Sequence, residues 1–154
     1  MPLAAAPSSR SNMLLDQVPE EVGRQLREAG KAIPLVVGDL VATPEDPITH
    51  VYFPTSGYIS LLSPAGSAAA LEVGLVGFEG MFGATLLLGV VHSPVTALVQ
   101  GAGAALRLKA GDFLRITAQN PALDTVTRRY LYIYLTQLGQ TAACNRSHSV
   151  NARM

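Results

Sequence analysis

The residues of this chain that could carry out chemistry are few and widely spaced. The three histidines, His50, His92 and His148, fall at a predicted strand start, in a loop and near the end of the chain. None of them shows the paired spacing with a second ligand that holds a metal ion. Glu72 and Glu79 are separated by a predicted strand and turn, and no Gly-x-Ser-x-Gly elbow is present. We therefore predict that the chain is not an enzyme and holds no metal ion or cofactor.

The sequence also lacks the ligands that an iron–sulfur or haem sensor would need. The single cysteine, Cys144, cannot form an intrachain disulfide or supply the several thiolates of an iron–sulfur cluster. A haem needs an axial ligand inside a pocket. His92, which stands near Pro94 in a predicted loop, is better explained as a surface residue.

The charges are sparse and unevenly placed. The net charge is zero and charged residues make up 14% of the chain, against about a quarter in typical domains. No Lys or Arg lies between Lys31 and Arg107, whereas five acids do: Asp39, Glu45, Asp46, Glu72 and Glu79. A nucleic-acid surface needs clustered cations, so we expect no DNA contact from these residues. An uncharged surface of this extent also suggests cover by a partner.

The sequence shows no pattern typical of a targeting signal. The first ten residues, MPLAAAPSSR, are small and rich in Pro and Ser, which predicts a disordered tail rather than a signal peptide. Gly, Pro and Ser interrupt the apolar runs, so no membrane span is expected and the predicted location is the cytoplasm.

The remaining chain divides into a helix, a β region and two further helices. Residues 13–30 read as helical, with Pro19 in the first turn and Gly30 at the stop. Short runs rich in Val, Ile, Tyr and Phe follow, with turns expected at residues 43–47 and 54–57. The predicted strands are Ile33–Val37, Asp39–Ala42, Thr49–Phe53, Tyr58–Ser63, Ala68–Val76, Val95–Gln100 and Ala104–Leu108. Regularly spaced short strands indicate a sandwich or barrel.

Helical periodicity returns after Leu108. A short helix is expected over Asp112–Gln119, a break at Asn120-Pro121, and a long helix from Pro121 to about Ala143. Two adjoining apolar stripes along the long helix suggest packing on two sides. One side would cover the β domain and the other would meet a second copy of the chain. Burial of the whole helix within its own domain is the alternative.

Three segments, in the same order, resemble the Crp/Fnr family of transcription regulators. They are His50–Ser60 (HVYFPTSGYIS), Val76–Gly80 (VGFEG) and Gln140–Val150 (QTAACNRSHSV). The resemblance implies a mainly β fold: a cyclic-nucleotide-binding-like jelly roll of eight strands over residues 11–119. It further implies a dimerisation helix over 120–145 and a hinge over 146–154. A winged helix-turn-helix that binds DNA would then begin where this chain ends, either because the chain is truncated or because it is naturally short.

The family's nucleotide-binding cassette is only partly matched. Glu79 stands where a glutamate contacts the ribose, but the family's arginine that pairs with the cyclic phosphate is replaced by Val95, followed by Thr96 and Ala97. A phosphate in a partly dry pocket needs a cation. We therefore expect no binding of cyclic AMP or cyclic GMP. The candidate pocket consists of Gly77, Phe78, Glu79, Gly80, Met81, Phe82, Val95, Thr96 and Ala97.

Three states of this pocket stay open: filled by its own side chains, which is favoured; occupied by a small neutral or apolar effector; and, last, occupied by a cyclic nucleotide. The predicted function is the sensor and dimerisation region of a Crp/Fnr-type regulator. The alternative is a dimerising interaction module without DNA binding. The homodimer interface is expected at Thr127, Tyr130, Leu131, Tyr134, Leu138 and Thr141.

Overall fold

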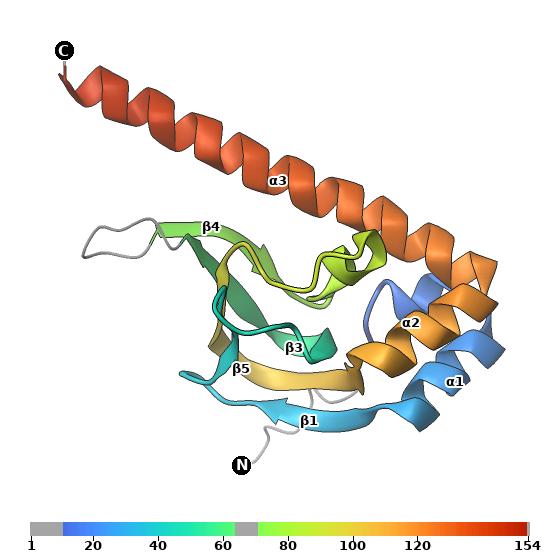
Figure 1. The fold of residues 1–154 in the computed structure, drawn as a ribbon. Coiled ribbons are helices and arrows are strands. Elements are labelled where there is room, and N and C mark those ends of the chain that lie inside the picture. Colours follow the sequence, from blue (N-terminus) through green and yellow to red (C-terminus); the bar gives the residue numbers. More distant parts are fainter. Residues whose placement is uncertain (1–10, 64–70, 154) are drawn as a thin grey trace.

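A single antiparallel sheet lies at the centre of the molecule, with helices at one end and along one side (Figure 1). The computed structural model describes residues 11–63 and 71–153, and the side chains of these residues as far as residue 140. The tail predicted over residues 1–10 lies outside this range. Within the described residues, the strand order is β1-β5-β3-β4, and β2 pairs with β5.

The predicted N-terminal helix is divided in two. A short 3₁₀ helix, η2 (Leu15–Gln17), precedes α1 (Glu20–Ala29). Pro19 stands immediately before α1 with an extended ψ of 150°, which separates the two helices. The expected stop at Gly30 is confirmed, and Val22 and Leu26 share the buried face of α1.

Two long, bent strands replace four of the predicted short ones. The strands are β1 (Lys31–Leu35), β2 (Leu40–Ala42), β3 (His50–Ser63), β4 (Leu71–Val76) and β5 (Thr96–Lys109). The turn predicted at residues 54–57 was wrong: β3 continues through it, with register shifts against β5. Gly57 adopts a φ of +72° there, and a side chain at Gly103 would overlap the Ser56 carbonyl. Small residues at this crossing let both strands bend together instead of ending.

Short bridges complete the jelly roll. The predicted turn near Pro44 is present between β2 and β3. Isolated antiparallel bridges join Pro47 to His92 and Tyr52 to Phe82. The Tyr52–Phe82 bridge holds the segment that resembles the family's cassette against β3, and the Pro47–His92 bridge joins the chain after this segment to the turn between β2 and β3.

Two helices follow the sheet directly. Helix α2 (Ala110–Gln119) begins where β5 ends, and α3 (Pro121–Arg153) follows after the single residue Asn120. The predicted break at Asn120-Pro121 is confirmed. Helix α3 continues past residue 145, so the residues predicted as a hinge are helical as far as Arg153.

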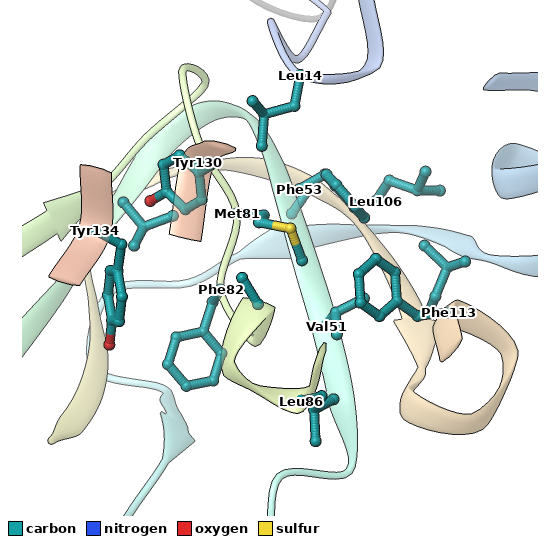
Figure 2. Packing of buried hydrophobic residues seen from close by; sticks show 14 of the residues in the cluster. Leu14, Val51, Phe53, Met81, Phe82, Leu86, Leu106, Phe113, Tyr130 and Tyr134 are labelled. Atoms are coloured by element: carbon teal, nitrogen blue, oxygen red, sulfur yellow. The ribbon is translucent and has the colours of Figure 1, made fainter. Parts of the chain in front are cut away.

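The core lies between the sheet, α2 and the first half of α3. Phe53 of β3 and Phe113 of α2 are fully buried, with ring centroids 6.3 Å apart. Figure 2 shows Met81 and Phe82 of the cassette segment among side chains of β3 and α3. Every buried side-chain nitrogen or oxygen of the described residues has a hydrogen-bond partner. The cassette segment is therefore part of the core and not a loop laid over it.

Candidate functional site

The cassette segment runs from Gly77 to Gly89 between β4 and β5. It contains one short 3₁₀ helix, η3 (Ala84–Leu88), whose two ends are Gly83 and Gly89. Both glycines have a positive φ, +107° and +77°. Only glycine adopts this conformation without strain, which explains how so short a helix can be enclosed by sharp turns.

A buried asparagine that the sequence analysis missed ties the cassette to the sheet. The side-chain amide of Asn12 donates hydrogen bonds to the carbonyls of Pro54 and Gly80, each 2.8 Å long. Its side-chain oxygen accepts from the Leu14 amide at 2.9 Å. The Met13 amide also donates to the Phe78 carbonyl at 2.8 Å. The chain before α1 thus holds both the bend of β3 and the start of the cassette.

Helix α3 covers the cassette with two tyrosines. The ring of Tyr130 lies so close to Gly80 that a side chain at that position would overlap it. Its hydroxyl is hydrogen-bonded to the Met81 backbone, and burial raises the pKa of Tyr130. The Tyr134 ring lies 6.4 Å from the Tyr130 ring, and burial raises the pKa of Tyr134 to about 12. Both phenols are therefore neutral groups that seal the cassette.

Glu79 does not point into a ligand site. Its side chain is exposed, and its carboxylate accepts a hydrogen bond from the Gly77 amide at 3.2 Å. The carboxylate therefore folds back on its own turn, away from the core positions occupied by Met81 and Phe82.

The residues between the cassette segment and the start of β5 include no cation at the position of Val95. Val95 is buried, and its amide donates to the Ser93 hydroxyl, which in turn donates to the Val95 carbonyl. Thr96 and Ala97 begin β5 opposite Leu62 and Leu61. Where the family resemblance would place an arginine, the structure has an apolar side chain enclosed by its neighbours.

The space between the cassette and α3 is almost closed. The cavity there measures about 10 Å³, room for a single water molecule. Its lining is neutral throughout: Ile48, Met81, Phe82, Gly83, Ala84, Thr85, Ser93 and Tyr134. A nucleotide or other effector would need Tyr134 and Phe82 to move.

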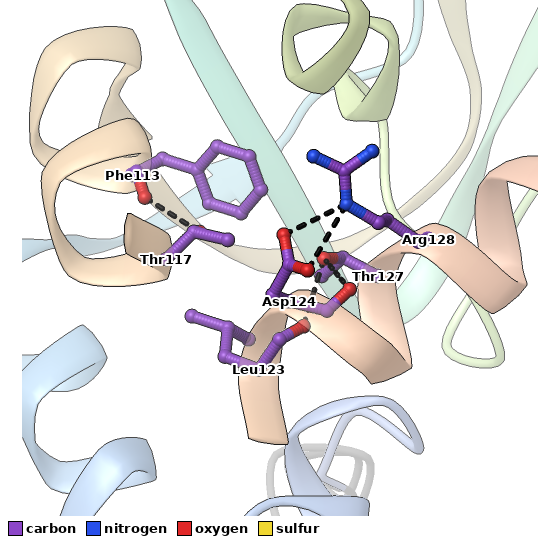
Figure 3. Close-up of polar contacts among 6 residues, drawn as sticks. All are labelled: Phe113, Thr117, Leu123, Asp124, Thr127 and Arg128. Carbon is purple, nitrogen blue, oxygen red and sulfur yellow. Dashed lines mark hydrogen bonds and ion pairs between the residues drawn. The ribbon is translucent and has the colours of Figure 1, made fainter. Parts of the chain in front are cut away.

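Most of the residues predicted at a dimer interface are packed inside the single chain. Thr127, Tyr130, Leu131 and Tyr134 are buried inside the single chain, and Leu138 is partly buried against the same core. The Thr127 hydroxyl donates to the Leu123 carbonyl within the helix (Figure 3). The cassette and the sheet together cover this side of α3, whereas Ile133 and Gln137, which the helical periodicity places beside Tyr130, are exposed. Thr141 lies beyond the described side chains.

A different face of α3 is open. Tyr132, Ile133 and Leu135 are 72%, 58% and 45% exposed. Near the start of the helix the same side carries Arg128, which pairs with Asp124 at 2.9 Å (Figure 3), and Arg129. Tyr132 lies on the side of the helix opposite Tyr130 and Tyr134, with Ile133 and Leu135 to either side of it. This face, defined by Tyr132, Ile133 and Leu135, is called the outer face of α3 below.

The histidines are not gathered into a site. His50 begins β3 with its Nδ1 atom 2.9 Å from the Thr49 hydroxyl, and His92 is exposed. The side chains of Cys144 and His148 lie outside the described range. Among the described residues, no three His, Cys, Asp or Glu side chains are close enough to hold a metal ion.

No helix in the described part of the chain combines the length and apolar character that a membrane span requires.

Comparison with solved structures identifies the fold. The N-terminal domain of a transcriptional regulator from Streptomyces coelicolor aligns over 82% of this chain and 90% of its own, with a TM-score of 0.62 and 21% identity. The Thermus thermophilus catabolite activator protein aligns over 88% of this chain with a TM-score of 0.70 and 16% identity. The chain has the fold of a Crp/Fnr-type sensor domain.

A further solved structure has the same fold. The sensor domain of the regulator DNR from Pseudomonas aeruginosa aligns over 80% of this chain and 88% of its own, at 15% identity and a TM-score of 0.62. The present chain spans 63% of the Thermus protein. No protein-family model and no curated protein matches the sequence. The three structures named are regulators or parts of regulators, not enzymes.

Proposed function

We propose that this chain is the sensor and dimerisation region of a transcription regulator, and that it does not respond to cyclic nucleotides. The composition and packing of the cassette support the proposal that cyclic nucleotides do not bind. The cassette has a buried valine in place of a cation, an outward-facing Glu79, and a cavity of about 10 Å³. A cyclic phosphate placed there would lose its hydration without gaining an opposite charge.

The regulatory role follows from what the fold connects. The cassette and α3 are in direct contact through Gly80 and Tyr130, so a change in one alters the packing of the other. Any DNA contact would come from a domain outside these 154 residues. A covering partner or a neutral effector would act by favouring one packing of the cassette against α3 over another.

Calorimetric titration tests the cyclic-nucleotide statement. We expect no heat of binding when cyclic AMP or cyclic GMP is added at concentrations up to about 1 mM, where only very weak complexes escape detection. A micromolar dissociation constant for either nucleotide would contradict the proposal, because such affinity requires a built phosphate site.

The alternative, an interaction module without DNA binding, differs from the regulator in what the gene encodes after Met154. Reading the coding sequence beyond Met154 distinguishes the two. A helix-turn-helix directly downstream supports the regulator, whereas a stop codon in the native gene supports a module that dimerises or competes for the helix of another regulator.

A further inference from the structure

One face of the sheet gathers positive charges that lie far apart in the sequence. Lys31 of β1 lies directly opposite Arg107 of β5, and His50 of β3 lies opposite Lys109 of β5. Arg107 and Lys109 are two residues apart in one strand, so both project from the same face. Cations that stand far apart in the sequence are therefore brought together by strand pairing. The stretch without Lys or Arg folds back so that the cations at its two ends meet.

These four side chains form a concave site. Together with Ala29 and Gly30 they line a cavity of about 230 Å³, beside the junctions of α1 with β1 and of β5 with α2 (Figure 1). Arg107 and His50 are half-buried, while Lys31 and Lys109 are exposed at the rim. Burial and, to a smaller extent, the nearby charges of Arg107 and Lys109 lower the pKa of His50.

Within the part of the chain that the structure describes, no ion pair joins an acid to this cluster. The ion pairs among the described residues join Glu21 to Arg24, Asp112 to Arg115 and Asp124 to Arg128, all within helices. Glu28 on α1 forms none of them. Asp39 lines the adjoining cavity with Arg107 but is not within ion-pair distance of it. Like charges directly opposite each other destabilise a sheet, so the folded chain holds uncompensated positive charge at a half-buried position.

We propose that the cluster of Lys31, His50, Arg107 and Lys109 binds the phosphate group of a small phosphorylated molecule. The planar guanidinium of Arg107 can donate two parallel hydrogen bonds to phosphate oxygens. The two lysines supply further charge from opposite sides. Since Nδ1 of His50 faces Thr49, its Nε2 atom is the one available to donate. Three cations around one cavity suit a single phosphate better than a DNA backbone, along which proteins typically neutralise about 6–10 phosphates.

This site is distinct from the cassette. Leu106 and Leu108, which alternate with Arg107 and Lys109 along β5, point to the opposite face and are buried in the core. Phosphate binding would therefore take place on the outside of the sheet, while the cassette stays closed.

Nuclear magnetic resonance with inorganic phosphate as the probe tests the site. Phosphate is added to the 154-residue chain at constant ionic strength, balanced with chloride, and the His50 ring signals are followed over a range of pH. We expect a saturable shift with a dissociation constant of about 1 mM or tighter. The pKa of His50 should rise, because a bound anion favours the imidazolium. His92 and His148, in the same spectrum, serve as internal controls.

Charge-removing variants locate the effect. Arg107→Gln, Lys31→Gln and Lys109→Gln should each weaken phosphate binding by about tenfold or more, since each removes a charge-assisted contact. Arg129→Gln removes one charge from α3 and should leave binding unchanged. If Arg107→Gln fails to fold, the two exposed lysine variants decide. Equal weakening by Arg129→Gln would show a general charge effect and overturn the site.

A second titration separates a small ligand from nucleic acid. A short fluorescent DNA duplex is followed by anisotropy under the same ionic conditions. Saturable phosphate binding without duplex binding supports the proposal. Duplex binding that requires Arg107 and Lys109, with no response of His50 to free phosphate, would overturn it in favour of a phosphodiester surface. No saturable response to either probe would also overturn it.

Discussion

At the scale of single residues, Asn12 shows how one polar side chain can hold several segments in place. It is fully buried, and its four side-chain hydrogen bonds join the chain before α1 to the bend of β3 and to the cassette. No hydrophobic partner could satisfy the carbonyls of Pro54 and Gly80, since a buried acceptor without a donor costs free energy.

Asn12→Ala should therefore lower the free energy of unfolding by about 3 kcal/mol, because it leaves two buried carbonyls and one amide without partners. Urea denaturation followed by circular dichroism measures this change. Ser11→Ala, at an exposed neighbour whose hydroxyl donates to the Asp16 carboxylate, is the matched control and should change stability by about 0.5 kcal/mol or less. A loss of similar size in both variants would contradict the role given to Asn12.

Val95 allows a test of whether the proposed lack of cyclic-nucleotide binding rests on the missing cation alone. Val95→Arg places an unpaired charge at a buried position, which should destabilise the fold by about 3 kcal/mol or more. We expect no gain of cyclic-AMP binding, because the cavity stays too small for the nucleotide. Thermal unfolding and calorimetric titration measure the two effects, with the half-buried neighbour variant Thr96→Arg as the control. Micromolar binding by Val95→Arg would show that the cassette is open and lacks only its charge.

At the scale of elements, the contact between the cassette and α3 depends on the absence of a side chain at Gly80. A Cβ atom there would overlap the Tyr130 ring. Gly80→Ala should thus force α3 and the cassette apart and cost about 1–3 kcal/mol of stability. Hydrogen exchange of the cassette amides should rise at the same time. Gly111→Ala, where the added carbon meets nothing within 4 Å, is the control. A Gly80→Ala protein as stable as the wild type would mean that the helix is free to shift.

The burial of Tyr134 against the cassette predicts how the stability of the protein depends on alkaline pH. The pKa of Tyr134 is raised by burial to about 12, against about 10 in an unfolded chain. Because the folded value is the higher one, the contribution of Tyr134 to stability is fully present below about pH 10. It is lost as the pH rises through about 12. Tyrosinate absorbance should therefore report ionisation of Tyr134 together with unfolding, and Tyr134→Phe should remove that component. Tyr132→Phe, at an exposed ring, is the control; a Tyr134 component that titrates while the fold stays intact would refute this account.

The elements also show which features the sequence could predict. The stop at Gly30, the break at Asn120-Pro121 and the long helix rest on local chemistry, and the structure confirms each of them. The continuity of β3 through Pro54 and the meeting of Lys31 with Arg107 depend on which strands pair. Strand pairing joins residues distant in the chain and leaves no local signal. The cassette was found by resemblance, whereas its closure by Tyr134 required the packing.

At the scale of the whole molecule, the outer face of α3 is the apolar surface most suited to a second copy of the chain. Tyr132, Leu135 and Gly139 follow the spacing of three and four residues that forms a two-helix seam. The first half of the same side carries Arg128 and Arg129, which would repel their counterparts in a symmetric pair. Close contact is therefore expected from Tyr132 onward, toward the C-terminal half of the helix.

Light scattering should then give about twice the chain mass at micromolar concentration, as expected for a symmetric pair. The double variant Tyr132→Glu with Ile133→Lys should yield a folded monomer, because both side chains are exposed in the single chain and their replacement leaves the core intact. Leu114→Lys, at an exposed leucine of α2, is the matched control and should remain dimeric. A monomeric parent chain would contradict dimerisation, and a dimer that survives the double variant would place the contact elsewhere. Loss of the dimer only in variants of Leu131 or Tyr134 would mean that α3 rotates on its own domain when two copies meet.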